Sequence, residues 1–323
     1  MKKLFLFLSF LSIVFVGCET DFNVNSSWEE VAVVYGLLDA GEGSALQQIK
    51  ISKAFLGEMD ALQMAQYKDS INFDSEALDV KILRTKINGD IDSISLYPFF
   101  TSRDQGVFND TIAIYTFSNA NQFLKENSNY ELIIKNKVTG NKVTGRTQLI
   151  SEFSFDGLRN NYEFGFYNPL QVDSLKYRFK VLKWYEPLHG KIYQVDMEFR
   201  YLENNDTLSL IWSQPLVTQY KYEVKLEGVK FFNFLRNNIK KDDTKFRKFV
   251  DINVIMTVGT ADLETYINVN QPVSGIVQER PQFTNIVNGL GLFSSRYTHV
   301  RNDVGLTDDT QKYLRDQLDR NFQ

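Results

Sequence analysis

The sequence predicts a mainly β protein: an N-terminal antiparallel β-sandwich of the Ig-like or transthyretin-like kind, followed by a second β-rich domain with a few short helices. Three observations support this fold class. Short stretches with alternating apolar residues recur along the chain, turn-forming residues separate them, and the composition is 43% hydrophobic and 14% aromatic. Alternation with a period of two is typical of strands with one buried face. A chain this apolar forms packed cores and is not globally disordered.

The first segment predicts export and lipidation. Two lysines precede an apolar run over residues 4–16, which is shorter than the roughly 20 residues that span a bilayer. Gly17 and Cys18 follow, and Cys18 is the only cysteine of the chain. The segment resembles a bacterial lipoprotein signal, which implies a signal peptide over residues 1–17 and a palmitate-type lipid on Cys18. A plain cleaved signal peptide and an uncleaved anchor are the alternatives.

Residues 18–28 are short and polar, and we interpret them as a tether between the lipid and the first domain. Glu19 and Asp21 resemble the acidic export tags of surface lipoproteins in Bacteroidetes-type envelopes. They favour a surface-exposed position at the outer membrane over a periplasmic one. The alternative is an ordinary solvated linker.

Residues 29–150 are expected to form the N-terminal sandwich. Turn clusters such as Asn88-Gly89-Asp90 and Thr139-Gly140-Asn141 separate the apolar runs. The expected strands cover residues 31–35, 48–52, 78–84, 91–97, 111–117 and 130–135. Short strands separated by turns are typical of antiparallel sandwiches.

Residues 151–323 are expected to form the second domain. A long strand is predicted over 175–185, and further strands over 192–201, 207–213, 217–227 and 249–258. Helices are predicted near 229–240 and 307–322, because apolar residues recur there at helical spacing. A shorter helix is predicted over 262–269.

Two stretches resemble a family of uncharacterised Bacteroidetes outer-membrane lipoproteins, classed as a domain of unknown function. One is the opening run over residues 33–58, and the other lies late in the chain, with the residues Asn285, Ile286, Gly289, Leu290, Gly291 and Phe293. The resemblance implies a cell-envelope role, since such families are often found near TonB-dependent receptors. Physically, the two glycines permit a tight backbone path and the apolar residues are core anchors.

No catalytic or metal-binding spacing stands out in the sequence. His189 and His299 have no second histidine or cysteine at a metal-ligand spacing, and we expect both to be solvated loop residues. A carboxylate pair of the glycosidase kind stays open, because its separation is invisible in a sequence. We therefore expect no enzyme activity, no metal and no cofactor. The net charge of −4 argues against nucleic acid as a partner.

An aromatic-rich stretch offers candidate ligand-binding residues: Tyr162, Tyr167, Trp184 and Tyr185. Exposed aromatic rings bind sugars and peptides through their flat faces. Trp184 and Tyr185, beside Pro187, are the pair expected to be exposed. The alternative is that these aromatic residues form a sheet core and a domain seam.

An Asp–Ser/Thr–aliphatic triplet occurs at five places, where composition predicts about one. The hydroxyl residues of the triplets are Ser70, Ser93, Thr111, Ser174 and Thr207. The triplet resembles the O-glycosylation sequon of Bacteroidetes exported proteins. The alternative is structural: Asp ends a turn, the hydroxyl residue begins a strand, and the aliphatic residue faces the core.

Together these features predict a lipid-anchored, non-enzymatic protein of the outer membrane. Its expected role is that of an accessory or binding partner of a TonB-dependent-type transport complex. The alternative is a standalone surface module that binds a glycan or a peptide.

Overall fold

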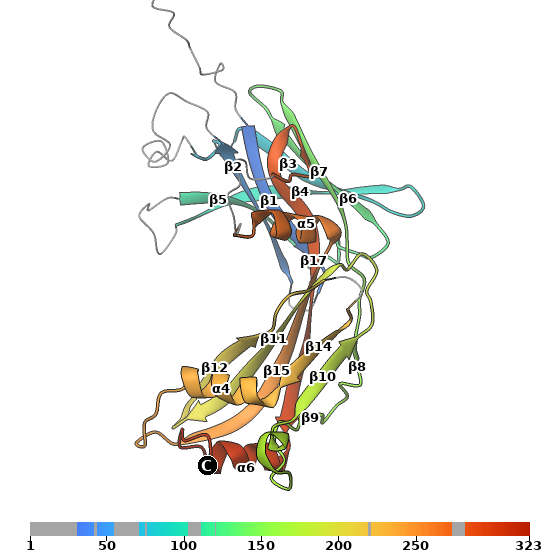
Figure 1. The fold of residues 1–323 in the computed structure, drawn as a ribbon. Coiled ribbons are helices and arrows are strands. Elements are labelled where there is room, and N and C mark those ends of the chain that lie inside the picture. The colour runs from blue at the N-terminus through green and yellow to red at the C-terminus, as the bar shows by residue number, and fades with distance from the viewer. Residues whose placement is uncertain are drawn as a thin grey trace, which may run out of the picture.

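The computed structural model describes residues 31–41, 44–54, 71–74, 76–102, 111–119, 121–218, 221–272 and 282–323. Within them the predicted mainly β, sandwich-like fold with a few short helices is confirmed (Figure 1). The signal peptide, Cys18, the tether and Ser70 lie outside the described residues. In the described part of the chain, no helix has both the length and the apolar character needed to cross a membrane.

The first half of the chain forms a sandwich around a hydrophobic core. Its strands are β1 (Val31–Asp39), β2 (Leu46–Ala54), β3 (Leu78–Thr85), β4 (Ile91–Ser102), β5 (Thr111–Ser118), β6 (Asn129–Asn136) and β7 (Lys142–Gln148). Strand β4 serves both layers, because its first half pairs with β3 and its second half with β5. Alternation places Ile49, Ile82 and Leu132 fully inside.

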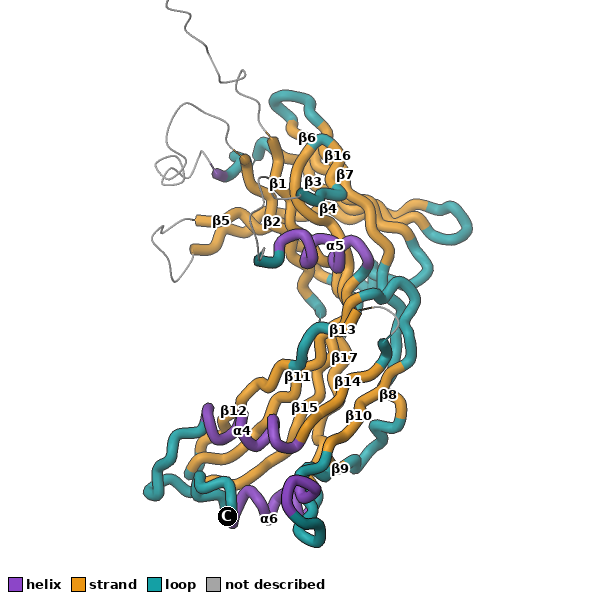
Figure 2. The backbone as a smooth tube through the Cα atoms, viewed as in Figure 1, coloured by secondary structure: helices purple, strands orange, loops and turns teal. Residues whose placement is uncertain are grey.

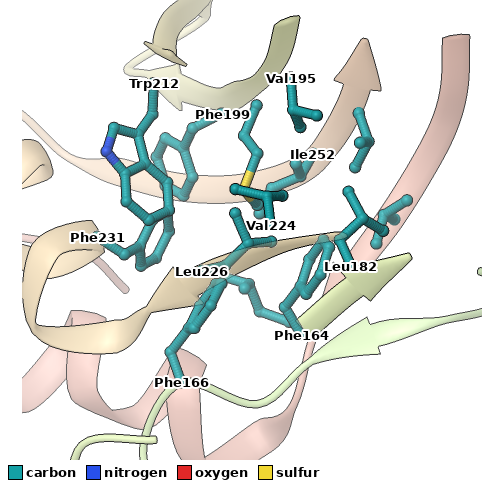
Figure 3. Packing of buried hydrophobic residues seen from close by; sticks show 14 of the residues in the cluster. Phe164, Phe166, Leu182, Val195, Phe199, Trp212, Val224, Leu226, Phe231 and Ile252 are labelled. Carbon is teal, nitrogen blue, oxygen red and sulfur yellow. The ribbon is translucent and has the colours of Figure 1, made fainter. Parts of the chain in front are cut away.

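The second half forms another core between a large sheet and a three-stranded sheet. Its strands are β8 (Phe155–Asp156), β9 (Glu163–Phe164), β10 (Phe179–Trp184), β11 (Ile192–Glu203), β12 (Asp206–Ser213), β13 (Val217–Thr218), β14 (Glu223–Glu227) and β15 (Arg247–Gly259). Strands β14, β10 and β8 make the small sheet. Figure 3 shows Phe199 of the large sheet, Leu182 and Leu226 of the small sheet, and Phe231 of a helix in one apolar cluster.

The described helices lie against these sheets (Figure 2). They are η1 (Asp173–Lys176, 3-10), α4 (Gly228–Asn238), α5 (Ala261–Asn270) and α6 (Asp308–Asp316). The apolar stripe predicted near 229–240 is the buried side of α4, with Phe231, Phe232 and Leu235 inside. Helix α6 ends before the predicted limit of 322, yet Leu318 and Phe322 are still buried.

Strand β17 (Gly289–Leu306), which follows the short β16 (Ile286–Val287), runs through both halves of the molecule. Its first part pairs in parallel with β1, from Ala32↔Gly289 to Asp39↔Arg296. Its second part pairs antiparallel with β15, so the large sheet is mixed. Ile286 and Phe293 belong to the first core and Leu306 to the second. One strand thus joins two cores over about 55 Å, at roughly 3.3 Å per residue.

The long strand predicted over 175–185 is wrong in its first part. Asp173 adopts a left-handed backbone with φ 49°, and residues 173–176 form a 3-10 turn. Strand β10 therefore begins only at Phe179.

Candidate functional site

Trp184 is buried, so the prediction that it is exposed is wrong. Its side chain is 3% exposed, because the alternation of β10 directs Leu182 and Trp184 to the same inner face. The indole packs against Tyr193, with ring centroids 5.3 Å apart. Its Nε1 has no hydrogen-bond partner in the described structure. Trp184 is thus a core residue and presents no face to a ligand.

The other three candidate aromatic residues lie in different surroundings. Tyr185 is 61% exposed, and its hydroxyl donates to Asp156 Oδ1 at 3.2 Å. Tyr162 is half-buried against Phe164, and burial raises its pKa. Tyr167 is buried and accepts a hydrogen bond from Gln317 Nε2 at 3.0 Å. Ligand binding by Tyr162, Tyr167 and Tyr185 stays a prediction. Of these three, Tyr185 has the ring that is largely exposed to solvent.

A cleft of about 640 Å³ lies where the two halves meet. The first half contributes Glu131 and Arg146, which form an ion pair at 3.1 Å. The second half contributes Lys191, whose Nζ lies 3.3 Å from Glu186 Oε1. The first turn of α5 contributes Asp262, which accepts from Asn285 Nδ2 at 2.8 Å. The charges that line the cleft are therefore largely paired.

His189 lines the same cleft from a tight turn. The Gly190 N–H donates to Pro187 O at 3.1 Å, and His189 has φ 67°. Burial and the neighbouring Lys191 charge lower the pKa of His189, so its imidazole is neutral at pH 7. The turn is held to the domain boundary because the Leu188 N–H donates to Ser151 Oγ at 2.9 Å.

The expectation of a solvated loop residue is wrong for His299 and holds in part for His189. His189 is half-buried in its turn, and His299 lies on β17. The His299 ring contacts Phe153 and Phe155, at centroid distances of 5.6 and 5.5 Å. In the described residues no group of three potential metal ligands gathers.

A second feature is an apolar loop at the end of the second half, which we name the tip loop (residues 168–176). Leu170, Val172 and Leu175 are 87%, 66% and 63% exposed. Fully burying such side chains contributes on the order of 1.5–3 kcal/mol each. Three of them in one short loop are therefore a substantial apolar surface left in water.

The base of the tip loop is closed by hydrogen bonds. The Asn168 N–H donates to Lys176 O at 2.9 Å, and the Leu170 N–H donates to Asn168 Oδ1 at 3.1 Å. Tyr167 and Tyr177 form a β-bridge directly beneath. The apolar side chains are thus presented on a fixed backbone and need little ordering on binding.

A tyrosine cluster connects this base to the helices. The Tyr177 and Tyr313 hydroxyls lie 3.2 Å apart, and this hydrogen bond is the main cause that raises the pKa of Tyr177 to about 12. The Tyr313 ring stacks on Phe232 of α4 at 3.9 Å. The tip loop therefore rests on α4 and α6 through aromatic contacts.

Sequence reasoning did not single out the tip loop. Its signal was present: aliphatic residues interspersed with Pro169, Gln171, Asp173 and Ser174, which are typical of loops. An apolar residue in such a stretch has no period-two strand to direct it inward.

The triplet hydroxyls within the described structure lie on the surface. Ser93, Ser174 and Thr207 are exposed, whereas the side chain of Thr111 is outside the described set. The structural alternative expected each aliphatic residue to face the core. Leu175 is 63% exposed and Leu208 39% exposed, so that expectation is wrong for these two triplets. Glycosylation itself stays a prediction.

No protein-family model and no curated protein sequence matches the chain.

Proposed function

We propose that the protein is a lipid-anchored, non-enzymatic cell-envelope protein that acts as an accessory or binding partner of an outer-membrane, TonB-dependent-type transport complex. The tip loop is the surface we assign to the contact with that complex. The lipoprotein-like segment that ends at Cys18 supports the anchor.

The observation that carries the proposal is the distance between the two ends of β17. The described part of the chain begins with β1, beside the start of β17, where Ala32 pairs with Gly289. The other end of β17 pairs with Phe164 of β9, immediately before the tip loop. The start of β1 and the tip loop are thus about 55 Å apart along one strand. A lipid on Cys18 would hold one end at the membrane and leave the apolar loop free for a partner.

Replacing the lipid acceptor tests the anchor. Cys18→Ser removes the sulfur that would carry the lipid, and we expect the fold to survive. Labelled palmitate is expected in the wild type and absent from the variant, which leaves the membrane fraction or stays unprocessed. Protease treatment of intact cells then distinguishes surface from periplasm. A variant that is processed and fractionates like wild type contradicts the anchor.

Replacing the exposed aliphatic residues of the tip loop tests its contact with the transport complex. The triple change of Leu170, Val172 and Leu175 to serine removes the exposed aliphatic groups and leaves the tyrosine base intact. After cross-linking in outer membranes, an identified transport receptor is expected to copurify with wild type and to be lost, at least tenfold, with the triple variant. Val138→Ser, at an equally exposed residue of the other half, is the matched control.

Two outcomes contradict the assignment. Recovery of the wild type as a lone monomer, with no envelope partner, argues against the complex. Equal recovery of the receptor with wild type and triple variant argues against the tip loop.

The alternative of a standalone glycan- or peptide-binding module rests on Tyr185. Its ring is open to solvent, and Leu188, in the same loop, is also exposed. A soluble form that starts after Cys18 is expected to bind an array ligand, and Tyr185→Ala to abolish that binding. An array without hits removes this alternative.

A further inference from the structure

Strand β12 ends the large sheet and carries none of the usual protections of an edge strand. The opposite end of the sheet is β16, which has two residues. The small sheet ends at β8, also of two residues, and at β14, which alternates Glu223, Lys225 and Glu227. Short length and charge are the common devices that stop edge pairing.

By contrast, β12 is eight residues long with the sequence DTLSLIWS. Its single charge is Asp206 at the start, and it contains no lysine and no proline. It pairs with β11 on one side, and no pairing occupies its other side in the described structure. Leu208 and Ile211 are 39% and 57% exposed. An edge of this kind is a template for another strand.

The hairpin register determines which backbone groups face outward. Glu203 and Asp206 flank the two-residue turn and form the closing hydrogen-bonded pair. Along an antiparallel ladder, hydrogen-bonded and non-hydrogen-bonded pairs alternate. The β12 residues in the non-hydrogen-bonded pairs therefore direct their N–H and C=O groups away from β11. These residues are Thr207, Ser209, Ile211 and Ser213.

The outward residues are arranged symmetrically about Leu210. If a second β12 lies antiparallel with the twofold axis at Leu210, Thr207 meets Ser213 and Ser209 meets Ile211 of the other copy. Every outward residue of both strands then joins a hydrogen-bonded pair. The only charge, Asp206, falls opposite Gln214, so no like charges oppose each other.

The side chains fit the same register. Trp212 is covered by α4, whose Phe231 and Phe234 rings lie 5.6 and 6.3 Å from the indole (Figure 3 shows the first pair). In the paired strands Trp212 lies beside Leu208 of the other copy. Leu208 would then lie at the margin of the contact between Trp212 and α4, and the exposed Leu216 lies just beyond the strand.

We propose that two copies of this chain associate through β12, antiparallel and centred on Leu210, to form one continuous sheet. This inference goes beyond the proposed function and does not depend on the identity of the transport partner.

Oligomeric state tests the association directly. The mature chain with Cys18→Ser, produced unmodified as verified by intact mass, is expected to form a concentration-dependent dimer in analytical ultracentrifugation. Unmodified protein is required because a glycan on Thr207 would block the edge. Ile211→Lys adds a charge to the edge and is expected to weaken dimerisation at least tenfold. Val181→Lys, at a similarly exposed residue of the central strand β10, is the control and should dimerise like wild type.

Cysteine cross-linking tests the register. The Cys18→Ser background has no other thiol. A single new cysteine can therefore form a disulfide only with the same cysteine of a second molecule. Leu210 faces Leu210 across the axis at a non-bonded pair, where Cβ atoms lie about 4.5–5.5 Å apart, and Leu210→Cys is expected to form a disulfide dimer. Thr207→Cys is displaced from its counterpart and should cross-link much less. A monomer at all concentrations, an unaffected Ile211→Lys dimer or equal cross-linking of both cysteines overturns the proposal.

Discussion

At the residue scale, Tyr115 is a polar group in an apolar core. It lies on β5, is 1% exposed, and its hydroxyl has no hydrogen-bond partner in the described structure. Burial, and then the Asp74 charge, raises the pKa of Tyr115 to about 12. A buried hydroxyl without a partner loses its hydrogen bonds to water on folding, at a cost of about 1–3 kcal/mol.

Tyr115→Phe is therefore expected to leave the free energy of unfolding unchanged or to raise it by about 1 kcal/mol at neutral pH. Below pH 10 the folded and unfolded states both keep the phenol proton. Above pH 10 the unfolded state loses it first, so wild-type stability falls as the pH rises toward 12. Urea unfolding at pH 7 and pH 11 is the measurement, and the variant should lose less stability between them. A clear destabilisation at pH 7 would contradict this.

Gly291 occupies a backbone position that other residues cannot take. It has φ 106°, and an added Cβ would lie 2.0 Å from Val34 O of the neighbouring strand. Gly140 also has positive φ, at 78°, but an added Cβ there meets nothing within 4 Å. The two glycines separate the cost of the backbone angle from the cost of the clash.

Gly291→Ala is expected to destabilise the protein by about 3 kcal/mol or more, because the β1–β17 pair must open to relieve the clash. Gly140→Ala is expected to cost about 1 kcal/mol, the usual cost of the strained angle alone. Thermal unfolding of both variants provides the comparison. Equal losses of stability in the two variants would show that the close approach of Val34 to Gly291 adds no cost beyond the backbone angle.

At the element scale, two of the triplets lie in surface elements and do not mark the start of a buried strand. Asp206-Thr207-Leu208 starts the edge strand β12, and Asp173-Ser174-Leu175 forms η1 in the tip loop. Both hydroxyls are exposed and both leucines face solvent to a large degree. Both sites are therefore accessible to a modifying enzyme in the single chain, whereas dimerisation through β12 would cover Thr207.

If the triplets are glycosylation sites, mass spectrometry of protein from its native envelope should show glycan on Ser174 and Thr207. Ser174→Ala and Thr207→Ala should each remove one glycan mass without a loss of stability beyond about 0.5 kcal/mol. Ser209→Ala, on the same strand but outside a triplet, is the control and should change nothing. Unmodified peptides at both sites would refute the prediction.

At the scale of the whole molecule, β17 determines which parts fold together. The first core contains Ile286 and Phe293, which lie more than a hundred positions after the rest of that core in the chain. Asp39, 5% exposed at the end of β1, bonds to Arg296 Nε at 2.8 Å and accepts from Thr298 Oγ1 at 3.2 Å. The two halves are thus joined by a shared strand and by a partly buried polar contact, in which Asp39 is covered and Arg296 is 48% exposed.

A fragment of residues 29–150 is therefore expected not to fold by itself. It lacks the strand that pairs with β1 and the Phe293 ring that fills its core. Adding a peptide of residues 282–297 should restore a cooperative unfolding transition in circular dichroism. The same peptide with Phe293→Ala, which removes about 3–5 kcal/mol of packing, is the control and should restore much less. A fragment that folds without any peptide would contradict the shared core.

The sequence by itself determined much of the local structure, and it predicts an export signal. Period-two alternation predicted β1 to β6, β11, β12 and β15. A strand with one buried face alternates apolar and polar residues, so its own sequence shows which face is buried. Helical spacing predicted α4 for the same reason. The lone Cys18 after a short apolar run is likewise a local pattern.

Only the tertiary structure decided which strands pair and which side chains are covered. Strand β17 returns to β1 across most of the chain, and period-two alternation carries no information about a distant partner. Trp184 is buried because Tyr193 lies across from it, whereas Leu170 in the tip loop has nothing opposite. The free edge of β12 has the same origin, since an edge is defined by the strand that is missing beside it. Burial depends on non-local neighbours, and these belong to the fold as a whole.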